Sequence, residues 1–291
     1  MASGMKRPIH EIEIVGFETY DLRFPTSLDA SGSDAMNPAG DYSAAHVRLK
    51  TNITDLIGHG ISFTIGRGNG LCTAAARMVA ERLVGKTLGE LTANMGKTWR
   101  YLVSDSQLRW VGPEKGVMHL GLSACVNALW DLWGRYLNKP VWKLVSDMTP
   151  GEFVACIDFR YIRDAITPEE AVTLLKEQEP TKKERIRIAE MNQAVPAYTT
   201  QAGWLGFSDE RMIELIQENL ATGMDKFKLK VGGNIEDDKR RLKIAREVIG
   251  YERMLMVDAN QVWGVQEAID AMKQLAEYKP TFVLTSLEDF R

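Results

Sequence analysis

Four polar residues in the second half of the chain have the types and the spacing that proton-transfer chemistry requires. Lys228 and Lys230 lie two positions apart in an apolar run, and Asp258 and Asn260 follow a later apolar run with the same spacing. A lysine that loses its proton can act as a general base, and two ammonium groups held close together disfavour each other's protonation. Carboxylate and amide oxygens are the type of ligand that Mg²⁺ binds, although one carboxylate alone does not define a metal site. This grouping favours a base beside an oxygen-rich site.

The elements around these residues predict that they meet on one side of a sheet. Side chains alternate along a strand, so Lys228 and Lys230 share one face and their apolar neighbours share the other. The stretch Ile235–Ile249 predicts a helix and Leu255–Val257 a second strand, which together make a right-handed parallel βαβ unit. Parallel strands are covered on both faces, so we expect the lysines to point inward. Two plainer alternatives stay open: the lysines form the wet face of a half-exposed strand, and Asp258 caps the next helix.

The order of the remaining elements predicts two halves of different class. Residues 1–150 predict an antiparallel meander followed by helices, and residues 151–291 predict strands that alternate with helices. The fold class is therefore an α+β domain followed by a (β/α) barrel-type domain. Strands are expected at Ile9–Leu22, Ala44–Lys50, Ile57–Ile65, Phe153–Asp158 and Thr281–Thr285, and helices at Leu71–Leu83, Leu88–Ser104, Glu114–Leu137, Thr167–Met191, Ser208–Thr222 and Val265–Tyr278.

Two glycine-bearing stretches in the first half could bind a ligand. Residues 26–41 are too long for a tight turn, and long ordered loops are usually lids or binding loops, so the alternatives are a binding loop and a floppy surface excursion. Gly66–Gly70 follows a strand and precedes a helix. The dinucleotide-binding fingerprint needs a glycine at its sixth position, where this chain has Leu71, so we do not expect a nucleotide site there.

Composition excludes several classes of protein. The chain has 291 residues, a net charge of −3 and a pI near 5.9, which does not favour a nucleic-acid partner. Its three cysteines are far apart and odd in number, which favours a reducing intracellular compartment, cytoplasmic or mitochondrial. No run of 18 apolar residues is present, so no membrane association is expected. No targeting segment is evident in the first residues.

The chain resembles the enolase superfamily, in its mandelate-racemase-type branch and close to the L-fuconate dehydratases. The strand with Lys228 and Lys230 followed by Val257–Gln261 carries the likeness, which extends from about Ile12 to Pro280. Further matching stretches are Asp21–Ser27, Asp41–Ala45, Asp105–Trp110, Gly112–Gly116, Ala128–Trp133, Lys139–Leu144 and Cys156–Tyr161. Such a set is highly specific. It implies a capping domain over residues 1–150 and a modified (β/α) barrel.

The resemblance also implies an activity, the dehydration of a small-molecule sugar acid. In the family pattern Lys230 is the base that removes the proton next to the carboxylate, Lys228 contacts the substrate, and Asp258 is the first of three carboxylate ligands to Mg²⁺. Gly32, Ser33, Asp34 and Tyr42 match positions where the capping domain contacts the sugar acid. The implied reaction is that of a lyase, converting L-fuconate to 2-keto-3-deoxy-L-fuconate. A homo-oligomer is an open alternative.

The family pattern breaks near the end of the sequence. The family continues after Pro280 with a strand that carries the second metal carboxylate, whereas this chain has Leu284 at that place, with Glu288 and Asp289 further on. No histidine falls in the position of the family's general acid. We therefore expect about half of a barrel, truncated with a divergent tail from about residue 281, and a chain that is inactive by itself. The alternative is a non-catalytic truncated isoform or fragment that binds a partner or is unstable.

Overall fold

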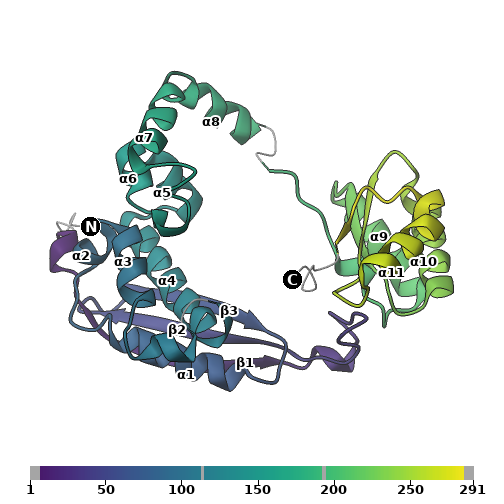
Figure 1. The fold of residues 1–291 in the computed structure, drawn as a ribbon, viewed down its shortest axis with the longest axis horizontal. Helices are drawn as coiled ribbons and strands as arrows, with labels where there is room; N and C mark the ends of the chain where they lie inside the picture. Colours follow the sequence, from purple (N-terminus) through teal and green to yellow (C-terminus); the bar gives the residue numbers. More distant parts are fainter. Residues whose placement is uncertain (1–6, 113–114, 192–194, 285–291) are drawn as a thin grey trace, which may run out of the picture. The chain divides into compact units, whose positions relative to one another are not determined.

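A computed structural model describes residues 7–112, 115–191 and 195–284 of the chain (Figure 1). These residues form two compact units, which are described separately. The first comprises residues 1–23 with 43–191, and the second comprises residues 24–42 with 192–291. The predicted domain boundary at residue 150 stays a prediction.

The first unit is built on a three-stranded sheet in the order β1 (Ile14–Phe24), β2 (Tyr42–Thr51) and β3 (Ile57–Thr64). Strands β2 and β3 are antiparallel, with Val47 opposite Gly60. Alternate residues of β2 are buried, as a sheet with one covered face requires. The meander is confirmed, although its first strand begins later than expected, because the 3₁₀ turn η1 (Ile9–Glu11) precedes it.

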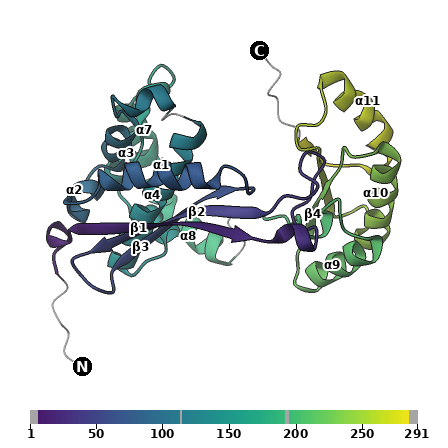
Figure 2. The same cartoon turned by 90° about the horizontal axis from the view of Figure 1, so that it is seen from below.

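Two long helices, α1 (Asn69–Glu81) and α4 (Gly116–Leu137), lie along this sheet (Figure 2). Gly60 of β3 lets the helix backbone come close, because a Cβ there would lie 2.0 Å from the carbonyl oxygen of Ala124. The predicted helix 88–104 is two helices, α2 (Leu88–Thr92) and α3 (Met95–Val103), since the Asn94 side chain caps α3. In the described part of the chain, no helix combines the length and the apolarity that a membrane span needs.

The regular elements of residues 141–191 are all helices, which corrects the prediction of a strand at Phe153–Asp158. The helices are α5 (Val141–Asp147), α6 (Pro150–Val154), α7 (Pro168–Glu177) and α8 (Lys182–Met191). The predicted strand Phe153–Asp158 is wrong, because Thr149 and Glu152 form a capping box that starts α6. The expected helical run from Thr167 is present, with a 3₁₀ turn, η5 (Glu179–Thr181), between α7 and α8.

The second unit contains the predicted βαβ unit. Its sheet is β4 (Lys226–Lys230), β5 (Met254–Asp258) and β6 (Val283–Leu284), all parallel and in that order. The helices are α9 (Asp209–Ala221), α10 (Ile235–Ile249) and α11 (Val265–Leu275), the last followed by the 3₁₀ turn η7 (Ala276–Tyr278). Thr199 adds one parallel bridge to β4. This alternation is that of a (β/α) barrel, and the expectation of an incomplete barrel stays a prediction, since Thr285 and the residues after it lie outside the described ones.

Candidate active site

The two lysines of β4 and the aspartate of β5 form the centre of the site. The parallel register places Lys230 opposite Asp258. Both ammonium groups contact the same carboxylate oxygen, Oδ2 of Asp258, at 3.1 Å from Lys228 and 2.8 Å from Lys230. Lys228, Lys230 and Asp258 are 6%, 7% and 4% exposed. The inward direction of the lysines is therefore confirmed, and the alternative of a wet strand face is wrong.

The apolar side chains of β4 explain why the lysines point inward. Phe227, Leu229 and Val231 are buried among apolar residues of α9 and α10, including Ile216 and Leu242. Burial of such large side chains stabilises the fold by roughly 1.5–3 kcal/mol each, so the strand cannot turn its other face to the helices without a large loss. The alternation in the sequence thus fixes the direction of both lysines.

Asp258 keeps its charge although it is buried. Burial works against ionisation of its carboxyl, but hydrogen bonds from Lys230, from the backbone N–H of Asn260 and from Lys228 outweigh it and hold the pKa of Asp258 below its ordinary value. The expected repulsion between the two ammonium groups is offset in this arrangement, because one carboxylate attracts both. The Asn260 side-chain oxygen accepts a further hydrogen bond from Lys230, at 2.5 Å.

Two aromatic residues that the sequence did not single out flank the lysines. The Lys228 ammonium donates a hydrogen bond of 3.3 Å to the Tyr198 hydroxyl and lies 4.9 Å from the centre of its ring. The Lys230 ammonium lies 5.7 Å from the centre of the Trp204 ring. Aromatic faces attract cations. Only the bridge between Thr199 and β4 shows that Tyr198 stands beside Lys228.

The loop over residues 26–41 is ordered and packs within the same unit as the lysines. Ser33 accepts two hydrogen bonds from the backbone, one from Leu205 N–H to its carbonyl oxygen at 3.2 Å and one from Gly206 N–H to its Oγ at 2.9 Å. The Tyr42 ring meets the Trp204 ring edge-on, with centroids 6.5 Å apart. The alternative of a floppy excursion is therefore wrong. Three of the predicted substrate positions, Gly32, Ser33 and Asp34, lie on a loop that is attached to the segment carrying Trp204, and the fourth, Tyr42, follows it as the first residue of β2.

The other predicted loop residues have structural contacts of their own. Asp34 Oδ1 accepts hydrogen bonds of 2.8 Å from the backbone N–H groups of Met36 and Asn37. Gly32 has a φ of +80°, and a Cβ there would lie 2.3 Å from the Tyr42 ring, so only glycine fits. Burial, and then the nearby Asp34 carboxylate, raise the pKa of Tyr42. The substrate-binding roles of these residues stay predictions.

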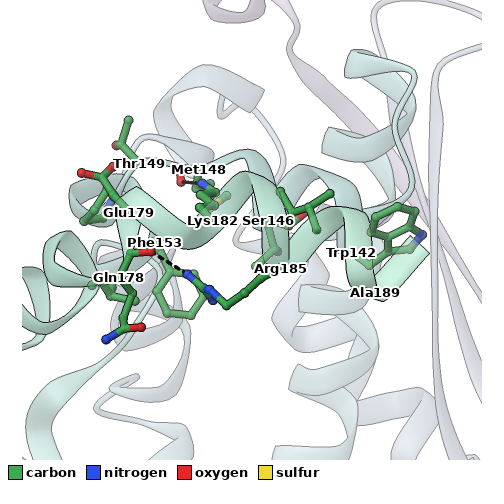
Figure 3. Close-up of a pocket in the computed structure, with 14 residues that line it drawn as sticks. Trp142, Ser146, Met148, Thr149, Phe153, Gln178, Glu179, Lys182, Arg185 and Ala189 are labelled. Atoms are coloured by element: carbon green, nitrogen blue, oxygen red, sulfur yellow. Dashed lines mark hydrogen bonds between the residues drawn. The ribbon is translucent and has the colours of Figure 1, made fainter. Parts of the chain in front are cut away.

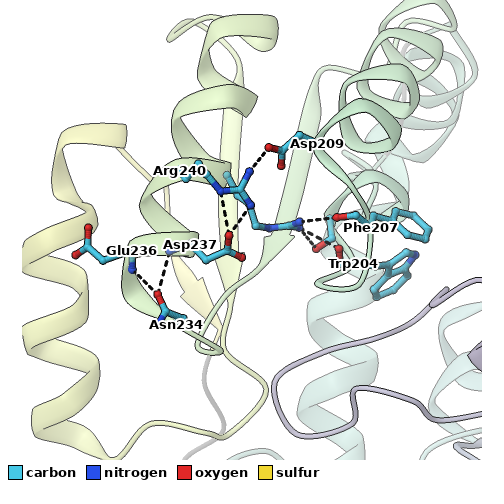
Figure 4. A network of polar contacts seen from close by, with 9 residues as sticks. Trp204, Phe207, Asp209, Asn234, Glu236, Asp237 and Arg240 are labelled. Atoms are coloured by element: carbon cyan, nitrogen blue, oxygen red, sulfur yellow. Dashed lines mark hydrogen bonds and ion pairs between the residues drawn. The ribbon is translucent and has the colours of Figure 1, made fainter.

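A buried arginine of α10 holds the segment that carries Trp204. Arg241 is 1% exposed, and its Nη2 donates hydrogen bonds of 3.0 Å to the carbonyl oxygens of Gly203 and Trp204. Its neighbour Arg240 is exposed and forms ion pairs with Asp209 and Asp237 (Figure 4). The burial of Arg241 lowers its pKa, and its carbonyl partners accept hydrogen bonds from the Nη atoms, whereas its Nε has no partner among the described residues. Helix α10 thus fixes one side of the site.

The oxygen atoms at the site match Mg²⁺ in type but not in number. Among the described residues no group of three His, Cys, Asp or Glu side chains is close enough to hold a metal ion. Asp258 offers one carboxylate and Asn260 one amide oxygen, and both contact the Lys230 ammonium. Mg²⁺ requires near-octahedral oxygen ligation. The described residues could therefore supply part of a Mg²⁺ site, with Asp258 as its carboxylate.

A separate hollow lies in the first unit, between α5, α6, α7 and α8 (Figure 3). Its volume is about 720 Å³, and its lining is mostly apolar, with Lys182 and Arg185 as the basic members. Both basic side chains donate hydrogen bonds to backbone carbonyl oxygens, Lys182 to Met148 and Arg185 to Gln178. None of the predicted site residues lines this hollow.

Known proteins resemble this chain in sequence. The family description "Enolase C-terminal domain-like" matches residues 211–283. L-galactonate dehydratase from Hypocrea jecorina is 63% identical over 275 residues, which are 94% of this chain and 61% of that protein. Human mitochondrial enolase superfamily member 1 is 47% identical over 264 residues, which are 90% of this chain and 59% of that protein. The chain thus spans less than two thirds of the length of these relatives.

Solved structures have the same fold. The crystal structure of the human protein has a TM-score of 0.91 at 44% identity, covering 97% of this chain and 64% of the other. A racemase from Streptomyces coelicolor with bound magnesium has a TM-score of 0.67 at 24% identity, covering 96% of this chain and 64% of the other, and at that identity shows the fold alone. These similarities in sequence and fold show that this chain belongs to the enolase superfamily.

Proposed function

We propose that this chain carries the part of a sugar-acid dehydratase active site that contains the base. The observation that supports this most directly is the buried centre in which Lys228 and Lys230 share Oδ2 of Asp258. Lysines are almost never fully buried unless they are paired, and Lys230 and Asp258 are the last residues of the parallel strands β4 and β5, at the end where barrel enzymes place their catalytic residues. The names of the sugar-acid dehydratases among the similar proteins agree with this chemistry.

In the proposed reaction Lys230 removes the proton from the carbon next to the substrate carboxylate. The electron pair of that C–H bond forms a C2–C3 double bond, the bond from C3 to its hydroxyl breaks, and the hydroxyl leaves as water once an acid has given it a proton. The resulting enol becomes a 2-keto-3-deoxy sugar acid. Lys228 contacts the substrate, and Gly32, Ser33, Asp34 and Tyr42 line its other side. No described residue is assigned as the acid.

Mg²⁺ is proposed as the cofactor, by family resemblance and from the oxygen donors. When bound, it would stabilise the negative charge that develops on the substrate carboxylate during proton removal. Among the described residues Asp258 is the carboxylate offered as a ligand, and one carboxylate with one amide oxygen falls short of the ligation that Mg²⁺ needs. We therefore propose that residues 1–291 by themselves do not turn over a sugar acid.

The proposed substrates are L-fuconate and L-galactonate. L-fuconate is the 6-deoxy form of L-galactonate, so the two acids share the configuration of the carbons that react. Discrimination between them depends on one hydroxyl group at the far end of the molecule, and a site that does not bind this hydroxyl would accept both.

A chimera tests this proposal. Residues 1–280 are joined to the segment of the Hypocrea jecorina enzyme that this chain does not span, and formation of the 2-keto product from each acid is measured with Mg²⁺. We expect turnover by the chimera, none by residues 1–291, and a loss of at least about 100-fold for Lys230→Ala in the chimera. Lys243→Ala, an exposed lysine of α10, is the control. Near-normal turnover by the Lys230→Ala chimera would show that the base is wrongly assigned.

A further inference from the structure

The hydroxyl hydrogen of Tyr198 has no hydrogen-bond acceptor among the described residues. A protonated lysine can only donate, so in the 3.3 Å contact between Lys228 Nζ and the Tyr198 oxygen, the tyrosine oxygen is the acceptor. The phenolic hydrogen therefore points elsewhere. Within the described parts of the chain, no other residue hydrogen-bonds to this hydroxyl. Tyr198 is 47% exposed, so a dissolved ligand can reach it.

Lys228 itself also has a donor left for a ligand. An ammonium group carries three N–H bonds. In this structure one is directed to Asp258 Oδ2 at 3.1 Å and one to the Tyr198 hydroxyl at 3.3 Å, and no third partner of Lys228 occurs among the described residues. A single ligand oxygen beside Lys228 could thus accept from the third N–H and from the Tyr198 O–H together.

The charge of the site selects the kind of oxygen that would bind there. Lys228 meets the ligand as an ammonium group, a charged donor, and the Asp258 oxygen that it contacts is shared with Lys230. The Tyr198 and Trp204 rings flank the ammonium groups. A carboxylate oxygen fits this environment better than a neutral hydroxyl, because hydrogen bonds to an ionised acceptor are roughly twice as strong.

We infer that Tyr198 is a substrate-binding residue that donates its phenolic hydrogen to the carboxylate of the sugar acid, at the oxygen that Lys228 also contacts. The inference rests on the proposed function, since it assigns the substrate of that site. The phenolic O–H of Tyr198 is a donor in addition to those of the lysine pair and of the loop over residues 26–41. Tyr198 precedes the bridge at Thr199, so the backbone of β4 holds it in place.

Calorimetric titration of residues 1–291 tests the inference. L-galactonate and L-fuconate are each titrated, with and without Mg²⁺, into the unmodified chain, Tyr198→Phe and the control Tyr251→Phe, an exposed tyrosine of the same unit. We expect Tyr198→Phe to weaken binding of both acids roughly tenfold, and Tyr251→Phe to leave it unchanged. L-galactono-1,4-lactone, which lacks the carboxylate, should show no difference between the three chains. Thermal melts of the variants check that their folds are equally stable.

The outcomes separate the inference from the proposed function. If the unmodified chain binds the acids and Tyr198→Phe binds them equally well, Tyr198 is not a substrate-binding residue, while the proposed function stands. If Tyr198→Phe weakens binding of the lactone as much as binding of the acids, the carboxylate is not the partner of the Tyr198 hydroxyl and the inference is wrong. If the unmodified chain binds neither acid at millimolar concentrations, the inference is wrong for residues 1–291, and turnover by the chimera decides the proposed function separately.

Discussion

Lys228 and Lys230 donate to one and the same oxygen atom of Asp258, from two positions on one strand. Nearly complete burial of all three groups makes this shared oxygen the main compensation for two desolvated positive charges. The arrangement therefore has a consequence for stability that does not depend on any substrate.

We expect Asp258→Asn to destabilise the second unit by about 3–5 kcal/mol, because it leaves two buried ammonium groups without a counter-charge. Chemical denaturation measures the loss. Asp270→Asn, an exposed aspartate of α11 that pairs with Lys273, is the control and should change little. Adding Lys228→Met to Asp258→Asn should recover part of the lost stability. A single variant as stable as the unmodified chain would show that the lysines do not depend on this carboxylate.

Arg241 gives a second prediction, because it is buried while its neighbour Arg240 is exposed. Arg241→Met leaves the carbonyl oxygens of Gly203 and Trp204 without their donor, at a cost of roughly 1–3 kcal/mol for each buried carbonyl. Arg240→Met should cost less than about 1 kcal/mol, as exposed ion pairs do.

Hydrogen exchange localises the effect of Arg241. The backbone N–H groups of Leu205 and Gly206 bond to Ser33 and should exchange faster in Arg241→Met than in Arg240→Met. Equal exchange in the two variants would mean that Arg241 does not hold this segment.

A third prediction concerns pH and Asp238 of α10. Asp238 is 1% exposed, its Oδ2 accepts from Gly232 N–H, and among the described residues its Oδ1 has no partner. Burial raises its pKa from an ordinary 3.8 to about 6, with nearby Asp237 adding to the effect and the Gly232 hydrogen bond opposing it. Between these two values the folded state binds more protons than the unfolded state, so the contribution of Asp238 to stability falls as pH rises from about 4 to 6.

Asp238→Asn removes this dependence, because its side chain does not titrate. The difference between the two pKa values corresponds to a change on the order of 3 kcal/mol across that range. The free energy of unfolding, measured at intervals between pH 4 and 7, should show a shallower fall in Asp238→Asn than in the unmodified chain. Glu236→Gln, in the same turn of the helix but exposed, should keep the original slope. If the free energy of unfolding has the same slope against pH in Asp238→Asn as in the unmodified chain, Asp238 is not the source of the pH dependence.

A fourth prediction tests the close packing of β3 on α4 in the first unit. In Gly60→Ala the new Cβ would lie 2.0 Å from Ala124 O and 2.4 Å from Ala128 N, both backbone atoms of α4. The helix must move, and we expect a loss of about 3 kcal/mol in chemical denaturation. Gly16→Ala in β1, where no atom lies within 4 Å of the new Cβ, should be nearly neutral. Similar losses in both variants would count against the close approach.

The sequence predicted the central part of the site because the relevant signal is local. The two-residue alternation around Lys228 and Lys230, with a helix and a second strand behind it, determines which side chains face the same way. It also places Asp258 at the adjacent strand end, as the register confirms. Two-sided burial of parallel strands then leaves little freedom for the direction of the lysines.

Other features depend on contacts between residues distant in sequence, and these could not be predicted. Arg241 looks like an ordinary basic residue of a charged helix, and only the packing of Gly203 and Trp204 against α10 shows that it is buried. A short apolar stretch such as the one that begins at Phe153 is compatible with a strand or a helix. The capping box at Thr149 favours the helix, and α6 begins there. The position of Tyr198 required the strand pairing itself.

The attachment of Ser33 to Gly206 spans 173 positions of sequence, although both residues belong to the second unit. A ribosome therefore completes β1, β2 and all of α1–α8 before the partner of the loop over residues 26–41 has been made. The sheet of the first unit can close early, since its contacts are local, while the loop waits without its partner. Bringing together two residues so far apart in sequence costs more chain entropy than forming local contacts. We therefore expect this attachment to form late in folding. Because the second unit consists of two separate segments, residues 24–42 and 192–291, no single cut in the chain can release it in one piece.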